Sequence, residues 1–339
     1  MHRIENSKNL LGIINYHYCY ANSFKIFQGL NGVKPEDFNL QIHKLNEKFN
    51  ITTLRKIFNK DYSQVHNKPK VCITFDDGTK DFIDCVYPIL SKYNIKVNLY
   101  ISSLPYTEKK IMNVHKIHLL QAKLGFKLFH NIFYEKLNDI YKKKIILDDI
   151  PLILSNNLYR YDDKKTKKFK TLLNYQLPYS ILSDLLSSIF VIVFNEKEED
   201  IVDKFYLSND DINFLIDKGF EIGAHSSSHP VLSRLNSNAQ HNEIIASANY
   251  FRKKFDIPEL SFAYPYGLEG TYNNDTIKIL SECPYIYSAV TMKREPIKNI
   301  SNKNLYEIPR YDNNDVFDND NNLKNNLNKL LNGYNSYEY

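Results

Sequence analysis

Two adjacent carboxylates, Asp76 and Asp77, lie where an apolar run of the chain ends at a glycine, Gly78. Residues 71–75, which precede them, have the composition of a buried β-strand, so we expect the pair at the carboxyl end of that strand, in a tight turn. Two neighbouring carboxylates repel each other unless a positive group lies beside them. A metal ion would meet this need and would also divide their roles, because one carboxylate can bind the ion while the other stays free as a base.

Two histidines, His225 and His229, follow a second apolar strand pattern at residues 220–224. Two imidazoles four positions apart converge on one ion when the backbone turns helically. A lone histidine is more simply explained as a structural or surface residue, but that does not account for two histidines and a carboxylate pair that each follow a strand. Barrel enzymes gather their sites at the carboxyl ends of parallel strands. We therefore expect a divalent-metal site formed by Asp77, His225 and His229.

The secondary-structure elements predicted around these residues alternate between strands and helices. Apolar strand patterns recur along the chain, at residues 10–16, 71–75, 97–101, 220–224, 260–263, 285–291 and 305–308. Helical patterns separate several of them, at residues 35–49, 82–90, from 208 onward and at 238–255. This alternation predicts parallel strands in an α/β architecture.

Two segments depart from this rhythm. Residues 105–205 combine lysines and aromatics with apolar positions at helical spacing and have few strand signals, which predicts an inserted helical region. Residues 313–339 form a polar tail rich in Asn and Asp, with one amphipathic stretch between Leu323 and Leu331 that predicts a short helix.

The composition narrows the class of protein. The 339 residues are 43% hydrophobic and 24% charged, which is typical of a soluble globular protein. The net charge of +5 is spread through mixed acidic and basic residues, so we expect no nucleic-acid partner. Four separated cysteines exclude a cysteine-based zinc site or disulfide framework. No signal-peptide pattern or membrane-span pattern is found, so we expect a cytoplasmic location.

Three separated motifs carry a family resemblance: Thr74-Phe-Asp-Asp-Gly78, His225-x-x-x-His229 and Phe262-Ala-Tyr-Pro-Tyr-Gly267. In this order they resemble the first three motifs of the polysaccharide deacetylases, the NodB-homology group of carbohydrate esterase family 4. The resemblance implies a distorted (β/α) barrel over residues 10–312, interrupted by the unmatched helical insertion at residues 105–205, which is a candidate lid.

The resemblance also implies roles for the motif residues. Asp77, His225 and His229 would hold the metal, Asp76 would be the general base, and the backbone N–H of Tyr266 would help to hold the oxyanion. The implied cofactor is a divalent ion, with Zn²⁺ expected first and Co²⁺, Ni²⁺ or Fe²⁺ as alternatives. This chemistry suits an amide, whose carbonyl a metal polarises while a carboxylate takes a proton from water.

One departure from the family pattern concerns the general acid. The late Leu-x-His motif is missing, and no histidine follows His241. Asn15-Tyr-His17 ends the first predicted strand instead, which resembles the biofilm poly-N-acetylglucosamine deacetylases, where the acid-bearing motif is moved to the N-terminus as in a circular permutation. His17 is then the expected acid, because the leaving amine needs a proton. The alternative is a histidine that only caps the strand through a backbone hydrogen bond.

A second departure concerns the orientation of the base. Family members often have an arginine where this chain has Ala263. Arg310, after a late strand, is a candidate replacement, because a guanidinium can hold a carboxylate through two contacts. A surface position for Arg310 remains the equal alternative.

Some aromatic and histidine residues have weaker signals. Tyr16 and Tyr266 are the expected stacking partners of a sugar. His115 and His118 lie three positions apart on a predicted helix of the insertion, where a solvated helix face is the preferred interpretation and substrate contact the alternative.

These inferences favour a metal-dependent hydrolase that removes an acetyl, or alternatively a formyl, group from an amino sugar. Without an export signal, we expect a nucleotide- or lipid-linked precursor or an oligosaccharide of surface-polysaccharide synthesis as substrate. The alternatives are a catalytically degenerate carbohydrate-binding protein and a hydrolase of non-sugar amides on the same fold. A pure binder has no need of a free base beside a metal, which argues against the first alternative. The oligomeric state stays open.

Overall fold

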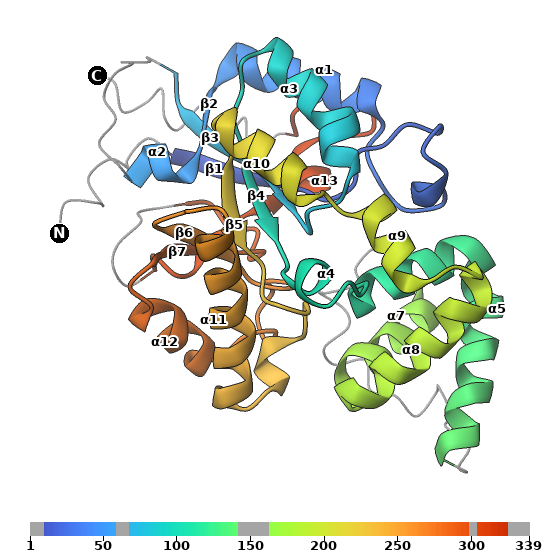
Figure 1. Cartoon of the computed structure of the whole chain (residues 1–339). Coiled ribbons are helices and arrows are strands. Elements are labelled where there is room, and N and C mark those ends of the chain that lie inside the picture. The colour runs from blue at the N-terminus through green and yellow to red at the C-terminus, as the bar shows by residue number, and fades with distance from the viewer. Residues whose placement is uncertain (1–9, 59–67, 142–162, 298–303, 325–339) are drawn as a thin grey trace.

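The computed structural model of the chain describes residues 10–58, 68–141, 163–297 and 304–324. It is a nearly closed barrel of parallel strands surrounded by helices, with a group of further helices beside the barrel (Figure 1). The predicted (β/α)-barrel class is therefore confirmed.

The barrel is one sheet with a parallel pairing between every two neighbouring strands. Its strands are β1 (Leu10–Tyr16), β2 (Asn50–Thr52), β3 (Lys70–Asp76), β4 (Asn98–Ile101), β5 (Glu221–Ala224), β6 (Leu260–Ala263), β7 (Ile286–Thr291), β8 (Ile308–Pro309) and β9 (Tyr311–Asp312). They lie in the order β8-β7-β6-β5-β4-β3-β1-β9, with β2 beside β3. Parallel strands are buried on both faces, which explains why they appear in the sequence as continuous apolar runs.

The two ends of this sheet are neighbours in the chain. β8 pairs with β7 through Ile308 and Val290, whereas β9 pairs with β1 through Tyr311 and Ile14. Only Arg310 separates β8 from β9 in the chain, so the segment 308–312 contains both end strands of the sheet and connects them. The chain therefore closes the barrel at Arg310, and the N-terminal strand comes to lie beside the C-terminal one.

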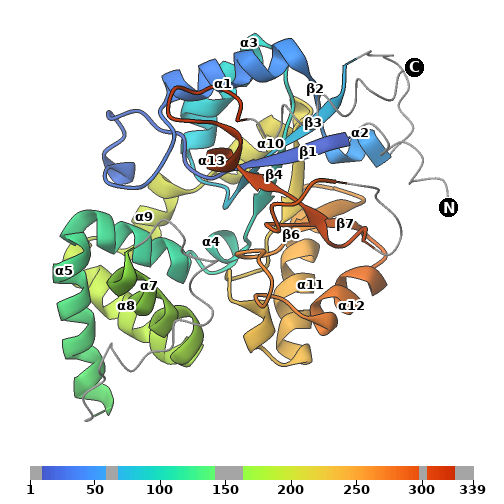
Figure 2. The ribbon, with the colours of Figure 1, turned by 180° about the vertical axis from the view of Figure 1, so that it is seen from behind.

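The helices of the barrel lie close to the predicted positions. They are α1 (Pro35–Lys48), α2 (Leu54–Phe58), α3 (Tyr87–Lys92), α4 (Leu104–Thr107), α10 (Asn209–Asp217), α11 (Ser237–Lys254), α12 (Asn274–Glu282) and α13 (Asn313–Val316). Ser208 and Asp211 form a capping box at the start of α10, as the acidic first turn predicted. Figure 2 shows α13 beside β1, which places the start of the C-terminal segment next to the N-terminal strand.

One predicted strand is displaced. Residues 305–308 were expected to be extended, but β8 begins only at Ile308. The N–H of Glu307 donates to the carbonyl of Asn304 and closes a turn there, so this donor is not available to a neighbouring strand.

The described part of residues 105–205 is helical, with α5 (Asn113–Tyr141), α7 (Lys164–Thr171), a π-helical turn (Leu172–Gln176), α8 (Tyr179–Phe194) and α9 (Glu198–Phe205). Figures 1 and 2 both show α5, α7 and α8 packed together at the side of the barrel. This group has a hydrophobic core of its own, which includes Phe129, Phe133 and Leu186 and extends to Phe27 after β1. The insertion is thus packed as a unit and is also fixed to the barrel.

Among the described helices, no single one is long and apolar enough to cross a membrane. Only α8 and α9 taken together reach the necessary length and mean hydropathy, and these two helices are bent by 83° relative to each other. Most of the predicted amphipathic stretch in the tail lies at residues 325–339, outside the described residues.

Candidate active site

The Asp76–Asp77 pair lies at the carboxyl end of β3, as predicted. Asp76 is the last residue of the strand, and both carboxylates are buried. The chain then turns through left-handed conformations, with φ of 75° at Asp77 and 69° at Gly78. A Cβ atom at Gly78 would lie 2.7 Å from the side chain of Ile101, so this position requires glycine. The strained turn separates the two side chains, which contact different partners.

Asp76 is held by Arg310 and Asn15. Nη1 and Nη2 of Arg310 donate to Oδ1 and Oδ2 of Asp76 at 2.7 and 2.8 Å, and Nδ2 of Asn15 donates to Oδ2 at 3.1 Å. Burial alone would raise the pKa of Asp76, but the Arg310 guanidinium, with smaller effects of His225 and His17, holds the pKa below its ordinary value. Asp76 is therefore ionised and fixed in orientation at neutral pH.

Asp77 faces the two histidines instead. Its Oδ1 lies 3.7 Å from Nε2 of His225 and 3.8 Å from Nε2 of His229. Each of the three residues offers one ligand atom, and these atoms lie within 4.8 Å of one another. Among the described residues, this is the group of carboxylate and imidazole side chains whose ligand atoms lie close enough together to hold one metal ion. Oδ1 of Asp77 is buried without a hydrogen-bond partner, which is costly unless a cation lies there. A carboxylate and two imidazoles fit a divalent metal.

The protonation states also suit a metal site. Nδ1 of His225 donates to the carbonyl of Ala263 at 2.8 Å, which leaves Nε2 as the free lone pair. Burial lowers the pKa of His225, and burial together with His225 lowers the pKa of His229 to about 3. Both rings are therefore neutral near pH 7, as metal ligation requires.

The segment 225–229 converges without being helical, so the expected helical turn is wrong. Ser226 and His229 have φ of 59° and 60°, and the N–H of His229 donates to Oγ of Ser226 at 3.0 Å. The half-buried carboxylate of Glu243 accepts from the backbone N–H groups of Ser227 and Ser228 at 3.0 and 2.8 Å. Side-chain acceptors thus replace the helical hydrogen bonds and hold the loop in a conformation that brings the two rings together.

His17 and Tyr266 flank this group. His17 is exposed just beyond the end of β1 and lies close enough to Asp76 and Asp77 to contribute to the electrostatics of both carboxylates. Tyr266 has a φ of 60°, and its ring meets the ring of His229 edge-on at 4.9 Å between centroids.

The expectation that Tyr16 stacks on a sugar is wrong. The ring is fully buried, stacks on Phe75 at 5.2 Å and donates its hydroxyl to Gln41. Neighbouring residues of a strand point to opposite sides, so Tyr16 enters the core while Asn15 faces the site.

Sequence reasoning gave no role to Asn15 and little weight to His115. Oδ1 of Asn15 accepts from Arg310 at 2.8 Å and from Thr74 at 2.7 Å. Its signal in the sequence is an amide inside an apolar strand. His115 is fully buried, with Nε2 3.2 Å from Oδ2 of Asp77. The preferred solvated face is therefore wrong for this residue, and also for His118, whose Nδ1 lies 3.0 Å from the hydroxyl of Tyr18.

A cavity of about 190 Å³ opens beside the metal-ligand group. It is lined from the barrel by His229, Pro230, Val231, Arg234, Leu235 and Tyr266, and from the insertion by Asn113, Val114, Leu173, Asn174, Pro178, Tyr179 and Leu182. The insertion therefore supplies one wall of the space next to His229.

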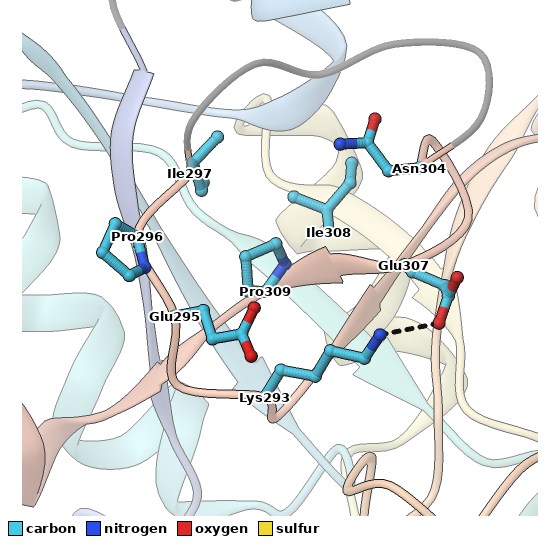
Figure 3. Close-up of a pocket in the computed structure, with 8 residues that line it drawn as sticks. All are labelled: Lys293, Glu295, Pro296, Ile297, Asn304, Glu307, Ile308 and Pro309. Atoms are coloured by element: carbon cyan, nitrogen blue, oxygen red, sulfur yellow. Dashed lines mark hydrogen bonds and ion pairs between the residues drawn. The ribbon is translucent and has the colours of Figure 1, made fainter.

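A second cavity, of about 220 Å³, lies beside β8 and contains the ion pair of Lys293 and Glu307 at 2.8 Å (Figure 3). None of the residues that line this second cavity is one of the three candidate metal ligands. The smaller cavity, which His229 lines, is therefore the one that adjoins the candidate metal site.

The family model described as polysaccharide deacetylase matches residues 184–288, which include both metal-site histidines. No curated protein sequence matches the chain significantly. This match confirms the predicted resemblance to the polysaccharide deacetylases over these residues.

Two of the solved structures that share this fold illustrate the likeness. The Streptococcus pyogenes deacetylase PplD in complex with acetate has 17% identity and a TM-score of 0.50, over 89% of this chain and 91% of that chain. The BpsB deacetylase domain from Bordetella bronchiseptica has 13% identity and a TM-score of 0.50, over 90% of this chain and 96% of that chain.

Proposed function

We propose that this chain, which resembles the polysaccharide deacetylases in sequence and in fold, is a metal-dependent hydrolase that removes an N-acyl group from an amino sugar. The observation that carries the proposal is the division between the two adjacent carboxylates. Asp76 is held by Arg310 and Asn15, whereas Asp77 faces two neutral imidazoles with an unpaired oxygen. A base beside a metal ligand is the arrangement that metal-assisted amide hydrolysis uses.

The metal would be held by Asp77, His225 and His229, and it would supply a polarised amide carbonyl and a water of lowered pKa. Asp76 accepts a proton from the attacking water, because its carboxylate is ionised at neutral pH. The bidentate contact with Arg310 weakens Asp76 as a base but fixes the direction of its oxygens, so no reorientation is needed during the reaction.

The leaving amine needs a proton, and His17 is the residue proposed to donate it. Its exposed ring lies at the end of β1, on the strand that also brings Asn15 to the base. The backbone N–H of Tyr266, in the left-handed turn against His229, is proposed to donate to the oxyanion. Base and acid then come from β3 and β1, which are paired neighbours in the sheet.

The cavity supports a small substrate rather than a long polymer. Arg234 in its wall donates to the carbonyls of Asn174 and Leu177, and the hydroxyl of Tyr266 donates to Asn174 at 3.2 Å. These contacts fix the insertion against the barrel and narrow the space beside His229. We therefore propose a terminal amino-sugar unit as substrate, such as a nucleotide- or lipid-linked precursor or a short oligosaccharide. The net charge of +5 is compatible with a substrate phosphate.

The test is the release of acetate and formate from N-acetyl and N-formyl amino sugars, supplied as nucleotide-linked sugars and as oligosaccharides of increasing length. We expect metal-dependent release that is fastest with the short substrates. The matched control is Asp76→Asn, which should lower release by about 10²- to 10⁴-fold. Equal release by Asp76→Asn would exclude the proposed base. Binding of these sugars without release of either acid would favour the carbohydrate-binding alternative.

A further inference from the structure

We propose that His115, from the helical insertion, is a positioning residue for Asp77, so that the insertion forms part of the metal site. The inference rests on the proposed function, because it concerns the same metal ligand. The inference goes beyond the proposed function because it gives the insertion a role in metal binding, in addition to forming a wall of the substrate cavity.

The two oxygens of Asp77 face different groups. Oδ1 faces His225 and His229 at 3.7 and 3.8 Å, whereas Oδ2 lies 3.2 Å from Nε2 of His115. The His115 ring is fully buried, so water does not compete for this contact. A ligating carboxylate whose second oxygen is engaged in this way is restricted in rotation, and such outer contacts raise metal affinity.

A chain of hydrogen bonds orients the His115 ring. The N–H of Met112 donates to the hydroxyl of Tyr206 at 3.2 Å, and this hydroxyl lies 2.6 Å from Nδ1 of His115. This hydroxyl already accepts from Met112, so we assign its own proton to the bond with Nδ1 of His115. With Nδ1 as the acceptor, the ring proton lies on Nε2, which is the atom beside Asp77.

This tautomer makes His115 a partner of Asp77 and not a fourth metal ligand. A protonated Nε2 has no lone pair to offer an ion, and His115 does not belong to the group whose ligand atoms converge. Nε2 of His115 approaches Oδ2 of Asp77 without the alignment of a full hydrogen bond. The contact therefore acts mainly through the electrostatic attraction between the N–H group and the carboxylate, across a short and buried distance.

Both ends of the insertion support the same turn. At its exit, the carbonyl of Phe205 accepts from the N–H of Lys80 at 2.8 Å, and the N–H of Leu207 donates to the carbonyl of Gly78 at 3.0 Å. Near its start, His115 contacts Asp77 itself. The turn that carries the metal ligand is therefore fixed from two directions by the insertion.

The test is zinc affinity, measured by competition with a chromophoric chelator on metal-free full-length protein that retains its circular dichroism spectrum. His115→Ala should weaken zinc binding by about 10- to 100-fold. His115→Gln, whose amide N–H₂ can reach the same oxygen, should recover most of the affinity. His118→Ala is the matched control, because it removes an imidazole from the same helix. That imidazole contacts Tyr18 and not Asp77, so the affinity for zinc should be unchanged.

The outcomes separate this inference from the proposed function. If Asp77→Ala abolishes zinc binding but His115→Ala binds as tightly as the wild type, the positioning role is wrong and the metal site stands. If the wild type binds no zinc, the proposed function fails as well. Should His115→Ala not fold, Tyr206→Phe gives a second test: loss of the hydroxyl that sets the tautomer should weaken zinc binding several-fold, and unchanged affinity would overturn the inference.

Discussion

The guanidinium of Arg310 makes two hydrogen bonds to the carboxylate of Asp76, across 234 positions of sequence. Both side chains are buried inside the barrel. Arg310 reaches this place because it lies between β8 and β9, where the chain joins the two ends of the sheet. The residue that closes the barrel is therefore also the one that holds the proposed base, although the family often has its arginine at the position of Ala263.

Arg310→Gln should destabilise the fold. The substitution leaves the Asp76 carboxylate buried without its cation, which costs about 3–5 kcal/mol in the free energy of unfolding. Urea denaturation followed by circular dichroism measures this change. Asp76→Asn in the same chain is the control, because it removes the stranded charge. The double variant should be more stable than Arg310→Gln alone, and strictly additive effects would mean that the two side chains do not interact.

Metal content should distinguish the adjacent carboxylates. Asp77→Ala removes a proposed ligand and should lose the bound ion, whereas Asp76→Asn should keep it, because Asp76 faces Arg310 and Asn15 instead. Elemental analysis of the purified variants, each compared with the wild type, gives the stoichiometry. Retention of a full equivalent of metal by Asp77→Ala would show that the ligand assignment is wrong.

His17→Ala should affect an amide more than an activated ester. The amine leaving group of an amide needs a proton, so its release should fall by about 10²- to 10⁴-fold. An aryl ester with a good leaving group needs no such donor and should be cleaved at nearly the wild-type rate. The ratio of the two rates is the measurement. An equal loss on both substrates would argue that His17 has only a structural role.

Asp81 should make the stability of the protein depend on pH. Its carboxyl is buried, and one oxygen accepts from the N–H of Cys19, just after His17. Burial raises the pKa of Asp81 from 3.8 to about 7, against the effect of its hydrogen bonds. Between about pH 4 and pH 7 the Asp81 carboxyl therefore binds more protons in the folded state than in the unfolded state, so its contribution to stability falls as the pH rises through this window. The loss is at most about 4 kcal/mol, at about 1.4 kcal/mol per pKa unit.

Asp81→Asn tests this pH dependence, because asparagine can still accept from Cys19 but does not titrate. The lowered pKa values of His225 and His229 act in the opposite direction but are common to both proteins. The unfolding free energy of the wild type minus that of the variant should therefore fall between pH 5 and pH 7.5, as measured by urea denaturation of both proteins at both values. The same pH dependence in both proteins would place the titrating group elsewhere.

Much of the fold could be predicted because its signals are local. Buried parallel strands are continuous apolar runs, and the helices begin at capping residues such as Ser208, so their positions were found within a few residues. A strand was predicted at residues 305–308, but its displacement to Ile308 was not, because the turn hydrogen bond of Glu307 has no signature in the composition. The loop 225–229 was misjudged because its geometry depends on Glu243, which lies on another element.

Short segments of the sequence identify the residues with the chemistry for this site, which are a carboxylate pair after one strand and two histidines after another. The division of the carboxylate pair depends instead on contacts between distant parts of the chain. Arg310 comes to Asp76 through closure of the barrel, and His115 comes to Asp77 through docking of the insertion. Both contacts join residues that are far apart in the chain. Neither has a local pattern, because an arginine after a proline and a histidine on a helix are equally compatible with the surface.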